Sequence, residues 1–229
     1  MSIADKLTTI AENVQKVYEA GKAAGGGTGG NYDEGYTDGL AEGSALFKAL
    51  AEGTLEEIND DTITSARTYA LAHNTSLKTA TLNNLTTAGV SFFVSCTALE
   101  TVNLPNLKKV PYTGFLGCTA LKNVYVPIAE SDYGCFMNCS SLEFVDLPKW
   151  AYMNAETFGG CTSLKTVILR YNGRMTLNNV SAFRATPFRN GEGGTIYVPQ
   201  ALVEAYKTAT NWNALESTTF LPIEGSEYE

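Results

Sequence analysis

Four of the five cysteines recur at a nearly constant spacing, and thiols in a regular array could bind a metal or carry out redox chemistry. Cys96, Cys118, Cys139 and Cys161 follow one another at steps of 22, 21 and 22 residues. Zinc ligands must converge on one point, whereas equivalent positions of a stacked repeat spread along a line with parallel Cβ vectors, which also disfavours disulfides. We therefore predict a ladder of buried, reduced thiols with no metal and no cofactor, and we expect Cys135, which lies off the ladder, to be the exposed thiol.

His73 is the single histidine and the other candidate for catalysis. A Ser-His-Asp or Cys-His site would have to use it, but it neighbours no nucleophile pattern, so we expect a core or turn position. The carboxylate pairs Glu56-Glu57 and Asp60-Asp61 are explained by a charged surface without a glycosidase. We therefore predict that the chain is not an enzyme.

The cysteines belong to a longer repeated motif, F-x-x-C-[ST]-[AS]-L-[KE]-x-V-x-[LVI]. Complete copies begin at Phe93, Phe115, Phe136 and Phe158, and a weaker copy surrounds Asn74. A period in the low twenties with Leu-x-x-Val-x-Leu is typical of leucine-rich repeats, in which each unit is a short strand plus a return segment. We expect the Leu and Val side chains to point inward and the strands to run parallel. Pro105, Pro127 and Pro148 should end their strands, because proline cannot donate to the ladder.

These residues carry a resemblance. The motif FxxC[ST]SLxxVxLP resembles the BspA-like, or Treponema-type, leucine-rich repeat of bacterial surface adhesins and of proteins of gut-bacterial prophages, and the resemblance covers about Leu55 to Leu169. The segment GGTIYVPQALVEAYKTATNW, residues 193–212, is similar to the strand-Val-Pro-helix-Trp segment that closes many of these arrays. The opening MSIADKLTTIAENVQKVYEAGK resembles the start of tail-region structural proteins in prophages of gut Firmicutes.

The fold class that follows is α+β, a right-handed leucine-rich-repeat solenoid with short parallel strands, preceded by a coiled-coil-like helix and closed by a strand-helix cap. In the cap, Tyr206 and Trp212 should cover the last coil together with Leu202 and Val203, and the final EGSEYE should be a frayed acidic tail. The predicted segments are an oligomerisation helix over 1–22, a Gly-rich linker and second helix over 23–52, the solenoid over 53–192, and the cap and tail over 193–229.

The N-terminal helix carries apolar residues at the 4-3 spacing of a coiled-coil seam. Ile and Val at both seam positions favour trimers over dimers, so we expect a homotrimer anchored through this helix. The alternative is an amphipathic helix packed on its own body. The predicted seam consists of Ile3, Leu7, Ile10, Val14 and Val17.

Composition excludes several classes of function. The net charge of −8 and the lack of any basic run argue against nucleic-acid binding. The N-terminus has no apolar core of a secretory signal, and no window approaches 18 consecutive apolar residues, so we expect neither a signal peptide nor membrane insertion. On this basis synthesis takes place in a cytoplasm.

The remaining chemistry is a surface, because side chains between the inward positions of a strand point out. One outward row should consist of Thr81, Asn103, Tyr125, Asp146 and Ile168, and the row beside it of Thr79, Thr101, Asn123, Phe144 and Thr166. Exposed aromatic residues beside polar groups are typical of recognition patches. The alternative is that Phe144 and Trp150 fill the edges of the core. The predicted ligand-binding residues are Asn103, Asn123, Tyr125, Phe144, Asp146, Trp150 and Tyr152.

The favoured hypothesis is a non-enzymatic, tail-associated structural protein of a phage virion, assembled in the host cytoplasm. Its N-terminal helix would bind other virion or tail proteins, and its solenoid would bind a host-surface protein or glycan. The alternative is a BspA-like adhesin or protein-binding module at the bacterial cell surface.

Overall fold

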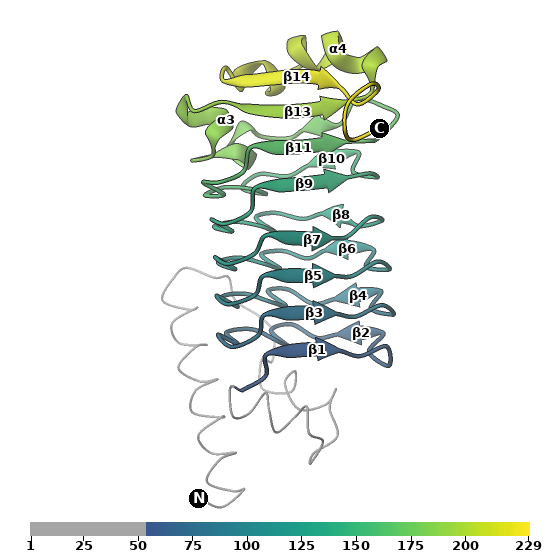
Figure 1. Cartoon of the computed structure of the whole chain (residues 1–229), viewed down its shortest axis with the longest axis vertical. Helices are drawn as coiled ribbons and strands as arrows, with labels where there is room; N and C mark the ends of the chain where they lie inside the picture. The colour runs from purple at the N-terminus through teal and green to yellow at the C-terminus, as the bar shows by residue number, and fades with distance from the viewer. Residues whose placement is uncertain (1–53) are drawn as a thin grey trace, which may run out of the picture. The chain divides into compact units, whose positions relative to one another are not determined.

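The structure is a computed structural model that describes residues 54–229. The predicted seam from Ile3 to Val17 and the predicted Gly-rich linker and second helix over 23–52 lie outside the described residues. Residues 56–229 form one compact unit of stacked coils (Figure 1).

Each coil contributes one strand to a long row that we call the front face, and most contribute a two-residue strand to a second row, the back face (Figure 1). The pairing is parallel throughout, which confirms the predicted solenoid of short parallel strands. The front strands are β1 (Glu57–Asn59), β3 (Thr79–Thr81), β5 (Thr101–Asn103), β7 (Asn123–Tyr125), β9 (Phe144–Leu147), β11 (Thr166–Leu169), β13 (Gly194–Val198) and β14 (Thr218–Pro222). The back strands are β2 (Ser65–Ala66), β4 (Thr87–Ala88), β6 (Lys109–Val110), β8 (Glu130–Ser131), β10 (Tyr152–Met153) and β12 (Thr176–Leu177).

The repeat spacing fixes the register of the front strands. Val102 at the centre of β5 pairs with Val124 of β7, 22 residues later, and Val145 of β9 pairs with Val167 of β11, again 22 residues later. Val102, Val145 and Val167 are buried, whereas Val124 is half-buried. The inward stripe of the motif therefore forms the core, as the sequence predicts.

The phenylalanines of the motif close the far side of the core as a stack. Phe93, Phe115, Phe136 and Phe158 are fully buried, and successive ring centroids lie 5.2, 5.2 and 5.7 Å apart with nearly parallel planes. These distances are close to the spacing of about 4.8 Å between neighbouring strands, so each coil adds one ring to the stack. Trp150 joins this stack at 6.5 Å from Phe136 and 6.4 Å from Phe158.

Each coil also turns through left-handed backbone at one repeated position. Ser95, Gly117 and Asn138 have φ values of 56°, 74° and 61°. Their amide groups donate short hydrogen bonds of 2.7, 2.8 and 2.7 Å to carbonyl oxygens of the next coil. The bond between coils compensates the conformational cost at the positions that are not glycine.

The front face is divided into two four-stranded sheets, because β7 and β9 are neighbours without a hydrogen-bonded ladder. Val102 pairs with Val124 at a step of 22, but Val110 pairs with Ser131 at a step of 21. The missing residue therefore lies in the turn between Val124 and Ser131. The step of 21 residues between Cys118 and Cys139 thus coincides with the division of the front face between β7 and β9.

The C-terminal cap covers the last coil as predicted. Tyr206 in α4 (Val203–Thr208) accepts a hydrogen bond at its hydroxyl from the Met175 amide, 2.7 Å away, and Trp212 donates its indole N–H to the Met175 carbonyl at 2.9 Å. Both side chains are buried, whereas Leu202 and Val203 are half-buried. The remaining short helices are η2 (Val180–Phe183), α3 (Pro187–Asn190), η3 (Gln200–Leu202) and η4 (Trp212–Ala214). Within residues 54–229, no helix has the length and apolar character to cross a membrane.

Two features after Trp212 differ from the sequence-based expectation. The strand β14 was not predicted, and it extends the front face by pairing with β13. The predicted fraying of the tail is wrong, because the chain after Ile223 folds back on the front face. Gly225 donates to the Glu229 carboxylate at 2.9 Å, and Tyr228 packs against two aromatic rings of the solenoid.

Candidate binding surface

The cysteine ladder is a structural device in the described chain. All five cysteines are free and buried. The thiols of Cys96, Cys118, Cys139 and Cys161 each donate to a backbone carbonyl of the preceding coil, at 2.9 to 3.2 Å. Burial raises the pKa of Cys96 to about 12 and raises the pKa values of Cys118, Cys135 and Cys139. These four thiols are therefore protonated at neutral pH and are poor nucleophiles.

The prediction of an exposed Cys135 is wrong. Cys135 directly precedes Phe136, and the residues at the same position of the other coils, Phe92, Gly114 and Thr157, are buried as well. The carbonyl of Cys135 accepts a 2.8 Å hydrogen bond from the amide of Phe115 in the preceding coil. The position points inward in each of these coils, whatever residue occupies it.

Asn74 and His73 occupy the turn of the first coil. The side-chain oxygen of Asn74 accepts hydrogen bonds from the amides of Ser76 and Leu77 at 3.1 and 3.0 Å, so it organises the turn as expected for a small polar residue. His73 has a φ of 58° and donates its amide to the Val94 carbonyl, and partial burial lowers the pKa of its imidazole. Among residues 54–229, no group of three or more His, Cys, Asp or Glu side chains is placed to hold a metal ion.

Five of the predicted ligand-binding residues lie together on the front face. Tyr125 on β7 pairs in register with Asn103 on β5, and Asn123 lies two residues before Tyr125 on the same strand. The neighbouring strand β9 presents Phe144 and Asp146 on the same face. We call these five residues the central block.

The exposed side chains of the central block are two aromatic rings and the amide of Asn123. Tyr125 is 57% exposed and Phe144 is 39% exposed, whereas Asn103 and Asp146 are half-buried. The carboxylate of Asp146 accepts hydrogen bonds from Nε of Arg170 at 3.1 and 2.9 Å, so its charge is neutralised within the fold. The block therefore presents apolar rings beside neutral amides. Such a surface fits polar-aromatic recognition and does not fit a strongly charged ligand.

Trp150 and Tyr152 do not lie on this surface, so the prediction that all seven residues form one exposed patch is wrong. Trp150 is fully buried in the phenylalanine stack, so the alternative of a core position holds for Trp150 but not for Phe144. Tyr152 is exposed, but it lies on β10 of the back face, where its hydroxyl is 3.4 Å from a carboxylate oxygen of Glu130. A two-residue back strand offers no alternation from which its face could be predicted.

The prediction that Ile168 points outward is wrong, because this side chain is fully buried. Its register partners are Asp146 on β9 and Tyr197 on β13. Tyr228 from the tail contacts Phe144 of β9 and Tyr197 of β13, on the two sides of β11. The tail therefore lies across β11, and we attribute the burial of Ile168 to it.

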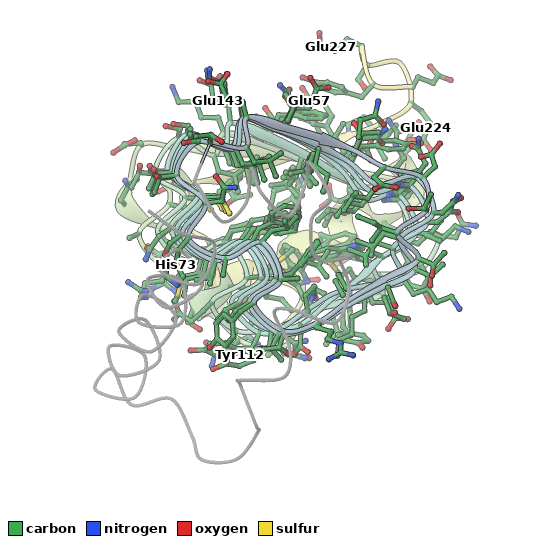
Figure 2. The ribbon with its side chains drawn as sticks, turned by 90° about the horizontal axis from the view of Figure 1, so that it is seen from below. Glu57, His73, Tyr112, Glu143, Glu224 and Glu227 are labelled. Atoms are coloured by element: carbon green, nitrogen blue, oxygen red, sulfur yellow. The ribbon has the colours of Figure 1, made fainter. Side chains whose placement is uncertain are left out.

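A second exposed aromatic cluster lies away from the front face and was not anticipated. Tyr112, which is 45% exposed, stacks on Tyr133 of the next coil with ring centroids 5.3 Å apart. Figure 2, which looks along the stacked coils, places Tyr112 on the side opposite Glu57 of the first front strand. This pair supplies a matched control for experiments on the central block.

The described fold is that of a leucine-rich-repeat solenoid, and comparison with known proteins assigns it to a family. The model of the BspA type leucine-rich repeat region matches in six copies, over residues 47–122 and 106–192. This match spans more than half of the sequence, and the chain belongs to the BspA-type leucine-rich repeat family.

Solved structures share the fold. A leucine-rich repeat protein from Bacteroides ovatus is 23% identical, with a TM-score of 0.54 over 74% of this chain and 42% of its own. The pneumococcal vaccine antigen PcpA is 16% identical, with a TM-score of 0.57 over 73% of this chain and 40% of its own. The chain thus spans about two fifths of the length of these proteins. No curated protein matches it.

Proposed function

We propose that the chain is a non-catalytic binding module whose central block contacts a partner protein. The observation that carries this proposal is the exposure of Tyr125 beside Phe144. Tyr125 is the most exposed large hydrophobic residue among residues 54–229, and it stands next to the division between the two front sheets. Its aromatic side chain loses little conformational entropy on binding, because only two side-chain torsions become fixed.

The neighbouring groups support a protein partner. Asn103 and Asn123 offer amide donors and acceptors next to the rings, and the only carboxylate in the block is paired with Arg170. Aromatic anchors surrounded by neutral polar groups are the composition found at the centre of protein–protein interfaces. A glycan is the alternative outcome that the experiment below can reveal.

The biological setting is a finer proposal. Membership of the BspA-type family supports the adhesion or protein-binding interpretation at a bacterial surface more than the virion interpretation. The proposed virion role, its tail partners and the homotrimer rest on residues 1–22, and they stay predictions. Mass spectrometry of surface-exposed peptides from cells and of purified phage particles would distinguish the two settings.

The experiment for the central block uses peptides selected from a displayed random library against the intact chain. Tyr125→Ala and Phe144→Ala should each weaken the dominant binders at least about tenfold, the effect expected when a central aromatic anchor is removed. Tyr112→Ala should leave the same binders unchanged, because that ring is comparably exposed and lies off the front face. Binders that depend on Tyr112 and ignore Tyr125, or a parallel glycan array that alone gives binding dependent on Tyr125, would overturn the protein-binding proposal.

A further inference from the structure

The C-terminal tail is seated on the front face by one aromatic ring. The ring of Tyr228 stacks on Phe144 with centroids 5.7 Å apart and meets the edge of Tyr197 at 4.8 Å. Phe144 and Tyr197 belong to β9 and β13, which lie on either side of β11. On β11 between them stand Thr166, in register with Phe144, and the fully buried Ile168, in register with Tyr197.

A single arginine links this seat to the tail backbone. Arg170 donates from Nη2 to the Tyr228 carbonyl at 2.7 Å while its Nε binds the Asp146 carboxylate. Asp146 thereby holds the guanidinium in the position where it reaches a main-chain carbonyl. The seat therefore combines two aromatic surfaces that contact a ring with a hydrogen-bond donor for the peptide backbone, and these are the groups that an aromatic residue of a polypeptide needs.

The tail itself is a compact turn that presents this ring. Ser226 accepts at its hydroxyl from the Tyr228 amide at 3.1 Å and donates to the Ile223 carbonyl at 2.6 Å. Glu227 and Glu229 are exposed, and Tyr228 is only half-buried. After Ile223, the described contacts with the rest of the solenoid run through the Glu224 carboxylate, which accepts from the Gln200 amide at 2.8 Å, and through Tyr228.

We infer that the seat formed by Phe144, Ile168, Arg170 and Tyr197 is a recognition site for a turn of a partner protein that carries an exposed aromatic side chain, and that Tyr228 occupies it in the free chain. This inference rests on the proposed function, because Phe144 is shared between the seat and the central block. A partner that covers Tyr125 and Phe144 reaches the edge of the Tyr228 ring. Displacing the tail exposes Ile168 and frees the Arg170 donor for the partner backbone.

Tyr228 is joined to the seat by a short segment of the same chain, and this connection determines how well a free peptide competes with it. A ligand joined to its site by a short segment competes at an effective concentration of about millimolar order, so a free peptide of the same sequence binds weakly while the tail is in place. Removal of the Tyr228 ring empties the seat without shortening the chain. A free aromatic peptide should then bind more tightly.

The test measures binding of a labelled synthetic peptide, IEGSEYE, which has the sequence of residues 223–229, to the full chain and to its Tyr228→Ala variant. We expect Tyr228→Ala to bind this peptide at least about tenfold more tightly than the native chain, because the competing ring is gone. The same peptide with alanine in place of its tyrosine should not bind. In the Tyr228→Ala background, Phe144→Ala should remove binding and Tyr112→Ala should preserve it, with circular dichroism verifying that each variant is folded.

Equal binding of the peptide to both chains, or no binding to a folded Tyr228→Ala chain, would overturn the inference. The proposed function fails by a different result, since its binders are selected on the intact chain and depend on Tyr125. If the selected binders lose affinity in Tyr125→Ala while IEGSEYE never binds, the central block stands and the seat does not. If IEGSEYE binds through Phe144 while no selected binder responds to Tyr125→Ala, the seat stands alone.

Discussion

The thiol of Cys118 donates a hydrogen bond to the backbone carbonyl of Phe93 in the preceding coil, over 3.1 Å. The same carbonyl accepts the amide N–H of Cys96, also at 3.1 Å. One carbonyl oxygen thus uses both of its lone pairs, one within its own coil and one toward the next. The cysteine recurs because this position needs a small apolar residue that can donate a weak hydrogen bond, and no chemistry of the sulfur is required.

The buried thiols should make the solenoid less stable in alkali. Burial raises the pKa of Cys96 to about 12 from an ordinary value of 9.0, so above pH 9 the unfolded chain releases a proton that the folded chain retains. Stability is therefore fully present below pH 9 and falls as the pH rises toward 12, by about 1.4 kcal/mol per pH unit for each such thiol.

Urea unfolding at pH 8, 9.5 and 10.5 measures this effect. Cys96→Ala should lower stability at pH 8, because its hydrogen bond is lost, yet show a shallower decline with pH than the native chain. An identical decline in the two proteins, or rapid alkylation of Cys96 in the folded chain at pH 8, would show that the thiol is not held protonated by burial.

Replacement of Trp150 should be among the most destabilising single changes. Its buried ring packs beside both Phe136 and Phe158, so Trp150→Ala should lower the free energy of unfolding by about 3–5 kcal/mol. Its indole N–H has no hydrogen-bond partner among the described residues, and Trp150→Phe should therefore retain most of the stability. Tyr125→Ala is the surface control, with a change within about 0.5 kcal/mol. Denaturation followed by circular dichroism would contradict this account if the Trp150→Ala and Tyr125→Ala changes were alike.

Left-handed turns give a paired prediction. Gly117 has a φ of 74°, and an added Cβ would meet the Ser95 side chain at an ordinary 3.6 Å, so only the backbone conformation penalises a side chain there. Gly117→Ala should cost about 1 kcal/mol of stability. Ser95→Gly, at the same position of the preceding coil, should be neutral or stabilising, because the strained residue is relieved. Thermal unfolding in which Gly117→Ala proved neutral and Ser95→Gly destabilising would refute this account of the turns.

The periodic part of the fold could be predicted from the sequence because each repeat buries the same positions. Leu99, Val102 and Phe115 have equivalents every 21 or 22 residues, and that near-constant period alone implies stacked coils with an inward stripe. The burial of Cys135 could not be predicted in this way. Its position is buried in four successive coils, but Phe, Gly, Cys and Thr occupy it in turn, so no residue pattern marks it as inward.

The candidate surface was predictable only where it depends on strand alternation. The alternation of inward and outward positions within each strand predicts that Tyr125 and Phe144 point outward, and both side chains are exposed. Ile168 stands in the same kind of position but is buried, because a tail some sixty residues later in the chain folds over it. Neither the alternation of β11 nor the composition of the acidic tail specifies that contact. It arises from tertiary packing of Tyr228 against rings of two other coils.

Hydroxyl-radical footprinting of the intact chain, free and bound to its strongest selected protein or peptide partner, tests the central claim most directly. The method reports the solvent exposure of aromatic side chains, and Tyr125, Phe144, Tyr112 and Tyr152 are all open to attack in the free chain. The account predicts that the partner protects Tyr125 and Phe144 and leaves Tyr112 and Tyr152 as reactive as before. Protection of Tyr112 and Tyr152, with Tyr125 still fully reactive, would contradict the assignment of the front face as the binding surface.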